Sequence, residues 1–156
     1  MKGATPKSTR LRRHALTAGG YALVILLMTT GCGSIKKDKM AITLQTATHG
    51  YQSALRWGYF ESAYAFVDPD QRKNTPMPPS LTGLRLTGYD VVQPPGVQKK
   101  DKEDEDEDSA IATQIVHIEY LYEDRQVVKS LTDRQIWRWD AEKKTWWLTS
   151  GLPAFE

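Results

Sequence analysis

Two titratable side chains, His117 and Glu119, stand two residues apart in a segment where apolar and polar residues alternate. That spacing puts both on one face of a β-strand, where an imidazole and a carboxylate can work as a general acid/base pair if the face lines a cavity. The opposite face would carry the apolar Val116 and Ile118. We therefore expect the face with His117 and Glu119 to meet solvent or a partner, and we assign no catalytic residue.

Patterns typical of other site chemistry are missing from the sequence. His49 has no second histidine, cysteine or paired acid at ligand spacing, so no metal site is expected. There is no Gly-Ser nucleophile elbow, phosphate-binding glycine loop or dinucleotide fingerprint. The run 101–108 holds seven acidic residues and one lysine. We expect a solvated acidic loop there rather than a calcium site, because calcium loops need glycine turns and defined ligand spacing.

Aromatic residues are the one unusual enrichment. Such side chains bury large areas in cores and also dominate protein interfaces. Because Trp146 and Trp147 are adjacent in an expected strand, they must point to opposite faces. We expect most of the set to be core, and we take Trp137, Trp139 and Trp147 as candidates for an interface or pocket. The full set is Trp57, Tyr59, Trp137, Trp139, Trp146 and Trp147.

The first 31 residues have the three-part layout of an export signal. They contain five basic residues and no acidic one, then an apolar run at 21–28, then small residues. This run is about eight residues long, or roughly seventeen counted from Ala15, against about 20 for a membrane-spanning helix, so a permanent spanning helix is the weaker interpretation. Cys32 follows directly and is the only cysteine, so it cannot form an internal disulfide. We expect residues 1–31 to be a cleaved signal peptide.

The segment Thr29-Thr30-Gly31-Cys32 resembles the lipobox of bacterial lipoproteins, with Thr29 where that family usually has leucine. The resemblance implies cleavage before Cys32 and covalent attachment of a diacylglycerol and an N-acyl chain to it, with no other cofactor. In that family an aspartate just after the cysteine favours the inner membrane, whereas Gly33 and Ser34 follow here. We therefore expect anchoring at the periplasmic face of the outer membrane, with the inner membrane as the alternative.

Loss of the signal peptide changes the charge of the chain. It removes five of 21 basic residues and none of 19 acidic ones, which leaves a net charge of about −3. No nucleic-acid partner is expected, because phosphate binding needs clustered basic residues in excess. The remaining length suits one domain. We predict a tether at 32–39 and a single domain over 40–156.

The apolar pattern predicts a helical region followed by four strands. Spacings of three and four favour a helix over 40–67 that is broken near Gly58, and a loop is expected over 70–80. The expected strands cover 81–92, 110–122, 126–139 and 145–150, the first ended by Pro94-Pro95-Gly96 and the third bulged near Thr132-Asp133. The predicted class is α+β, with the helix packed on a curled four-stranded antiparallel meander.

Two aromatic-rich regions carry a second resemblance, to the nuclear transport factor two-like superfamily, over roughly residues 41–152. The residues are Tyr51, Ala54-Leu55-Arg56-Trp57-Gly58, Phe60-Glu61 and Ala63, then Gln135-Ile136-Trp137, Trp139, Lys144 and Trp146-Trp147-Leu148. The resemblance implies a cone-shaped sheet around a helix. That family holds isomerases and dehydratases as well as non-catalytic binding domains. No catalytic motif of its enzymes matches here, so no functional residue is carried over.

These observations favour a lipid-anchored, periplasm-facing, non-catalytic domain of the bacterial envelope. We expect it to bind another envelope protein, or a second copy of itself, through one sheet face. The alternative is a small-molecule binding protein, or an isomerase or dehydratase, that uses the cone cavity with His117 or Asp90 as polar groups.

Overall fold

A computed structural model describes residues 32–98 and 110–156 of the chain. The chain divides after Asp38 into two units, of which the second covers residues 39–156. The expected signal peptide at 1–31 and the acidic loop at 101–108 lie outside the described residues. All contacts discussed below are within the second unit.

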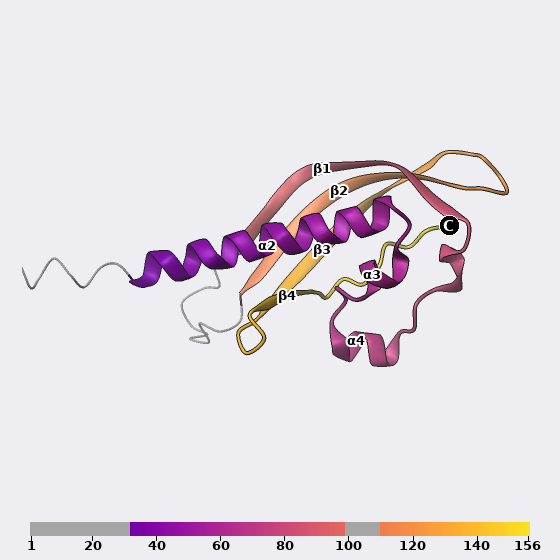
Figure 1. The fold of residues 1–156 in the computed structure, drawn as a ribbon. Helices are drawn as coiled ribbons and strands as arrows, with labels where there is room; N and C mark the ends of the chain where they lie inside the picture. Colours follow the sequence, from indigo (N-terminus) through magenta and orange to yellow (C-terminus); the bar gives the residue numbers. More distant parts are fainter. Residues whose placement is uncertain (1–31, 99–109) are drawn as a thin grey trace, which may run out of the picture. The chain divides into compact units, whose positions relative to one another are not determined.

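The second unit contains a four-stranded antiparallel sheet with a long helix across one face (Figure 1). The strands follow one another in the sheet in the order β1-β2-β3-β4. This arrangement confirms the predicted α+β class and the N-terminal helix on a curled antiparallel meander. The elements are α2 (Cys32–Arg56), α3 (Phe60–Tyr64), α4 (Pro69–Asn74), a short 3-10 turn (Pro79–Leu81), β1 (Leu84–Gln98), β2 (Ile111–Tyr122), β3 (Lys129–Asp140) and β4 (Thr145–Leu148).

The helix α2 packs on the sheet through one apolar stripe. Leu44, Tyr51 and Leu55 are at most 3% exposed, and their spacing of seven and four residues returns each to the same side of the helix. The helix ends just before Gly58, whose φ of +72° is a left-handed conformation that glycine adopts without strain. The predicted break near Gly58 is confirmed, and the chain continues into α3.

Alternation in β2 decides which face of the sheet is the core. Val116, Ile118 and Tyr120 are buried against α2, whereas Glu119 is exposed on the opposite face. The strand also has nearly the predicted bounds, 111–122 against 110–122. This alternation is regular along β2. The pairing of β2 with β1 and β3 therefore determines which residues of those two strands point inward.

Several predicted boundaries are wrong. The helix predicted over 40–67 begins earlier, because residues 32–39 of the expected tether form the first turns of α2, and the predicted loop at 70–80 contains α4 and the 3-10 turn. Pro94-Pro95-Gly96 does not end β1. Prolines are tolerated there because β1 is an edge strand, and a register shift between Gln93 and Gly96 absorbs them.

The boundaries of the last two strands also differ from the prediction. β3 begins at Lys129 rather than at 126, and β4 ends at Leu148 rather than at 150. The bulge predicted near Thr132-Asp133 is absent from the pairing of β2 with β3, which is regular throughout. The irregularities lie instead between β1 and β2.

Asp68 joins α4 to the sheet. Its side chain accepts a hydrogen bond from the Asp70 backbone N–H at 2.9 Å and pairs with the Arg138 guanidinium of β3. Burial alone would raise the pKa of the Asp68 carboxyl. The hydrogen bonds from Arg138 and Asp70, together with the charge of Arg138, outweigh burial, so the pKa lies below its ordinary value of 3.8.

We expect Asp68→Ala to destabilise the domain by about 1 kcal/mol, the usual cost of losing a helix N-cap. Since the folded-state pKa is depressed, this contribution is complete above pH 3.8 and is lost as the pH falls through the folded-state pKa. Urea unfolding of wild type and variant at pH 7 and at decreasing acidic pH measures both effects. If Asp68→Ala destabilised the domain equally at pH 7 and in acid, the ionised Asp68 carboxylate would not be the source of the stabilisation.

Candidate functional site

The outer face of the sheet, turned away from α2, carries the predicted acid/base pair. Asp90 of β1 pairs directly with His117 of β2, and His117 with Thr132 of β3. His117 is partly exposed, while Asp90 and Glu119 are exposed. None of them lines any of the three hollows found on the described surface. The small-molecule alternative placed His117 and Asp90 inside the curled sheet. Both residues lie instead on its outer face.

The aromatic candidates divide between core and surface. Trp137 is fully buried and Trp139 is 8% exposed, so both are core residues of β3. Trp147 lies on the outer face, where its indole Nε1 donates to Asp140 Oδ2 at 3.1 Å. Two residues at the end of α2 remain largely uncovered: Trp57 is 73% exposed and Tyr59 is 63% exposed.

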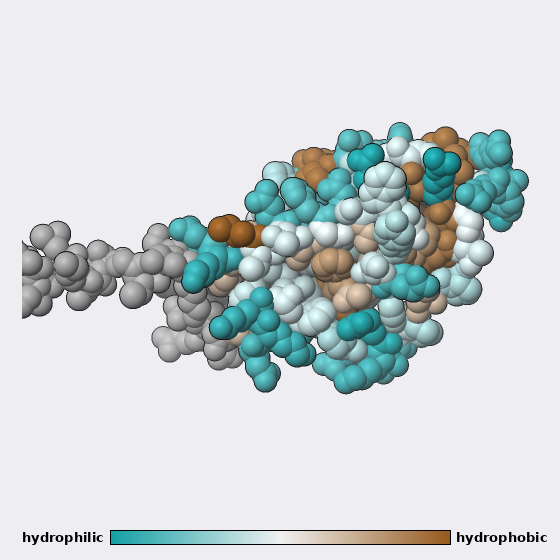
Figure 2. Space-filling model, in the orientation of Figure 1, coloured by the Kyte–Doolittle hydropathy of each residue, from teal (hydrophilic) through white to brown (hydrophobic). Residues whose placement is uncertain are grey.

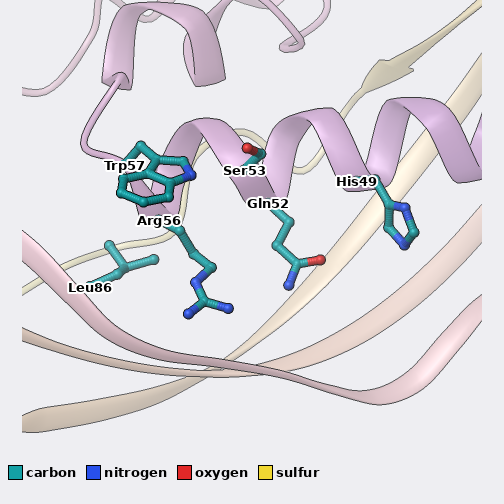
Figure 3. Close-up of a pocket in the computed structure, with 6 residues that line it drawn as sticks. All are labelled: His49, Gln52, Ser53, Arg56, Trp57 and Leu86. Atoms are coloured by element: carbon teal, nitrogen blue, oxygen red, sulfur yellow. The ribbon is translucent and has the colours of Figure 1, made fainter.

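Two adjoining hollows lie between α2 and the edge strand β1, and we call them together the α2–β1 groove. They measure about 540 and 560 Å³ and share His49 and Gln52. In Figure 3 the side chains of His49, Gln52 and Arg56 point from the helix toward the strands, with Leu86 of β1 opposite. The hydrophobic areas on the face shown in Figure 2 are separate rather than continuous. The groove itself is lined by polar residues such as Gln52 and Arg56 and by apolar ones such as Leu44 and Leu86, so its character is mixed.

The larger hollow has a buried amide at its floor. Gln114 of β2 lines it and is only 2% exposed. Gln114 pairs across the ladder with Gln135 of β3, which is fully buried. Directly opposite residues have Cβ atoms about 5 Å apart, so the two amides are neighbours on the inner face.

Hydrogen bonds extend this pair into an interior polar cluster, which we define as Tyr51, Tyr89, Gln114, Asp133 and Gln135. Gln135 Nε2 donates to Tyr89 Oη and to Asp133 Oδ2, each at 3.0 Å. The cluster therefore extends from Gln114, at the floor of the groove, to the partly buried carboxylate of Asp133.

The cluster is largely shielded from water, and this burial shifts the pKa values of its titratable groups. Burial raises the pKa of Asp133 above its ordinary value, although the hydrogen bond from Gln135 opposes the rise. Burial also raises the pKa of Tyr89 to about 12, and that of Tyr51 well above its ordinary value, helped by the charge of Asp133. Both tyrosines are neutral at physiological pH and act as hydrogen-bonding groups rather than as bases.

Several polar atoms of this region have no hydrogen-bond partner in the described protein. They are Tyr51 Oη, Gln114 Oε1, Gln135 Oε1 and Trp137 Nε1. An unpaired buried polar group costs about 1–3 kcal/mol, so such atoms are rare in cores unless another molecule satisfies them. Of these four atoms, only Gln114 Oε1 belongs to a residue that lines one of the described hollows, so that hollow has one unpaired buried acceptor in its wall.

Sequence reasoning did not single out this cluster. The available signal was Gln114, a polar residue on the face of β2 that otherwise carries Ala112, Val116 and Ile118. Gln135 and Asp133 repeat that signal on β3. It was missed because an amide on an apolar face has no recognised catalytic pattern.

In residues 32–98 and 110–156, no three or more His, Cys, Asp or Glu side chains are grouped to hold a metal ion. No helix in the part of the chain that the structure describes is both long and apolar enough to cross a membrane. Comparison with protein-family models, curated proteins and solved structures finds no match to this chain.

Proposed function

We propose that this protein is a lipid-anchored, non-catalytic interaction domain of the bacterial envelope, held by Cys32 and facing the periplasm from the outer membrane. Its partner is an envelope protein or a second copy. The observation that carries the interaction is the open α2–β1 groove beside an unpaired strand edge. The curled sheet over a helix also supports the proposed relation to the nuclear transport factor two-like superfamily.

The two edges of the sheet differ. Val67 forms a parallel bridge with Leu148 of β4, which covers that edge, whereas no described strand pairs with the outer edge of β1. An open edge exposes backbone donors and acceptors that an extended segment of a partner can pair with. Pro94 and Pro95 lack an N–H, so such pairing is confined to the first part of β1, residues 84–93.

Exposed apolar side chains border that edge and supply contact area. Val91 is 45% exposed and Val92 is 66% exposed on β1, and Trp57 stands at the end of α2. Large aromatic side chains such as Trp57 dominate binding energy at many interfaces. Backbone pairing with flanking apolar contacts is the usual way in which an extended segment binds a sheet edge.

Photo-crosslinking in living cells tests this proposal. A photoreactive amino acid at Gln45 or Ser53, both exposed in the groove, is expected to give one defined product, whereas Thr132 on the outer face is expected to give none. A product of twice the protomer mass identifies self-association. Equal yields from both faces, or no product from the groove, would refute the groove as the interface.

A matched pair of substitutions sharpens the test. Val92→Lys places a charge on the open edge of β1 and is expected to reduce the crosslinked product by about tenfold, because lysine on an edge strand opposes further pairing. Val127→Lys changes a valine of similar exposure, 61% against 66%, in the β2–β3 connection and should leave the product unchanged.

Small-molecule binding is a second candidate function, and one specific observation favours it. The buried Gln114 Oε1 has no hydrogen-bond partner in the described protein, and Gln114 lines the larger hollow. A partner strand along the edge of β1 does not satisfy this oxygen, because Gln114 lies on the inner face of the sheet.

A further inference from the structure

We propose that the partner at the open edge of β1 is a second copy of this chain, whose own β1 pairs antiparallel with the first through residues 84–91. The two sheets then join into one continuous sheet, with Thr87-Gly88 of each copy beside the two-fold axis. This inference deepens the proposed interaction function and rests on it, because both use the same strand edge.

The free backbone groups of β1 alternate along the strand. The Glu123 N–H donates to the Gly83 carbonyl at 2.9 Å, so residue 83 bonds toward β2. Successive residues of an antiparallel strand bond on opposite sides. Leu84 and Leu86 therefore direct their backbone N–H and C=O groups to the open edge, where no described strand pairs with them.

An irregularity in β1 lies at the centre of the proposed junction. The register shift between Leu86 and Gly88 makes Thr87 an extra residue in the pairing with β2. Beyond it, Tyr89 and Val91 are the next residues whose backbone groups face the open edge. Residues 84, 86, 89 and 91 all have an N–H to donate, and they are placed symmetrically about the irregularity.

The inner-face side chains match when two copies of β1 are centred on Thr87-Gly88. Leu86 then lies opposite Tyr89 of the second copy, and Leu84 lies opposite Val91. Apolar residues meet apolar residues in each pair, which is the arrangement that stabilises neighbouring strands. Val91 is 45% exposed in the single chain, and the second copy would cover part of it.

The exposed charges of β1 are complementary in the same register. Arg85 lies opposite Asp90 of the second copy, and the two-fold axis produces this ion pair twice. Within its own sheet Arg85 faces the apolar Leu121 and Asp90 faces His117, and no ion pair of the described residues includes either charge. Symmetric registers centred on Arg85 or on Asp90 would oppose like charges. Only the register centred on the irregularity pairs both charges.

The end of α2 and the membrane add to the association. Trp57 is 73% exposed and lines the same hollow as Leu86, a residue of the proposed junction. Burial of Trp57 from both copies would supplement the modest area that one strand pair buries. The proposed lipid anchor would also confine both copies to one membrane, which raises their effective concentration.

Charge reversal tests the register on the full chain purified in detergent. Arg85→Asp and Asp90→Arg are each expected to weaken self-association by about tenfold or more, because either change puts like charges into both pairs. A mixture of the two variants should associate about as tightly as the wild type, since every pair is then again of opposite charge. Sedimentation velocity with one variant fluorescently labelled measures these affinities. A mixture no tighter than either variant alone would overturn the register.

Oxidative crosslinking in native membranes tests the second copy itself. Thr87→Cys places an exposed thiol beside its own copy at the axis, and oxidation is expected to give a disulfide-linked product of twice the protomer mass. Val127→Cys is the matched control, 61% exposed in the β2–β3 connection, and should give no such product. No product from Thr87→Cys, with a different protein captured by photo-crosslinking in the groove, would overturn the second copy and keep the proposed function. No product in either experiment would refute both.

Discussion

Cys32→Ala is expected to abolish lipid attachment completely and to leave the protein as an uncleaved precursor. Cys32 is the only thiol in the chain, so no other residue can accept a thioether-linked diacylglycerol. Each buried methylene of an acyl chain contributes about 0.8 kcal/mol to membrane attachment, and two or more chains give stable anchoring. Metabolic labelling with a clickable fatty acid, followed by gel electrophoresis, measures both the label and the size of the product.

Ser34→Ala is the matched control, since it changes a neighbouring small residue without removing the acceptor. It should be labelled and processed like the wild type. Density-gradient separation of the two membranes then tests the proposed address, with wild-type protein expected in the outer-membrane fraction. Fatty-acid label retained on Cys32→Ala would refute the lipoprotein proposal, and wild-type protein in the inner-membrane fraction would correct the location alone.

The fold was predictable where local pattern and burial agree. The alternation around Val116 and Ile118 defines β2 within one residue, and the spacing of Leu44, Tyr51 and Leu55 defines the buried stripe of α2. The errors occur where tertiary context overrides a local signal. Prolines such as Pro94 and Pro95 usually end a strand, because they lack the N–H that would bond to a neighbouring strand. At the open edge of a sheet no neighbouring strand needs that N–H, so β1 continues through them.

The site was less predictable than the fold. The position of His117 and Glu119 on the outer face of β2 was predicted from the alternation of apolar and polar residues in that strand. Gln114, Asp133 and Gln135 come together only through the register of β2 with β3, which no local pattern specifies. The one sequence signal, a polar side chain on an otherwise apolar face, becomes informative once the pairing is known.

The aromatic set shows the same dependence on context, and Trp137, one of its three buried members, should carry the largest stability effect in the domain. Trp137 is fully buried and packs edge-to-face against Tyr51, with ring centroids 5.7 Å apart, and against Phe66 at 6.4 Å. Trp137→Ala removes these contacts and leaves a large cavity, for which the usual cost is about 3–5 kcal/mol. Small domains are stable by only about 5–15 kcal/mol, so a measurable unfolded fraction is expected.

Trp57→Ala makes the identical chemical change at a site that is 73% exposed, and it should alter the unfolding free energy by less than about 0.5 kcal/mol. Urea unfolding followed by circular dichroism compares the two variants directly. Trp137→Phe should fall between them, because a ring can still meet Tyr51 edge-to-face while the unpartnered indole N–H is removed. Similar losses for Trp57→Ala and Trp137→Ala would mean that α2 does not pack on the sheet as described, and the groove between α2 and β1 would have to be abandoned with it.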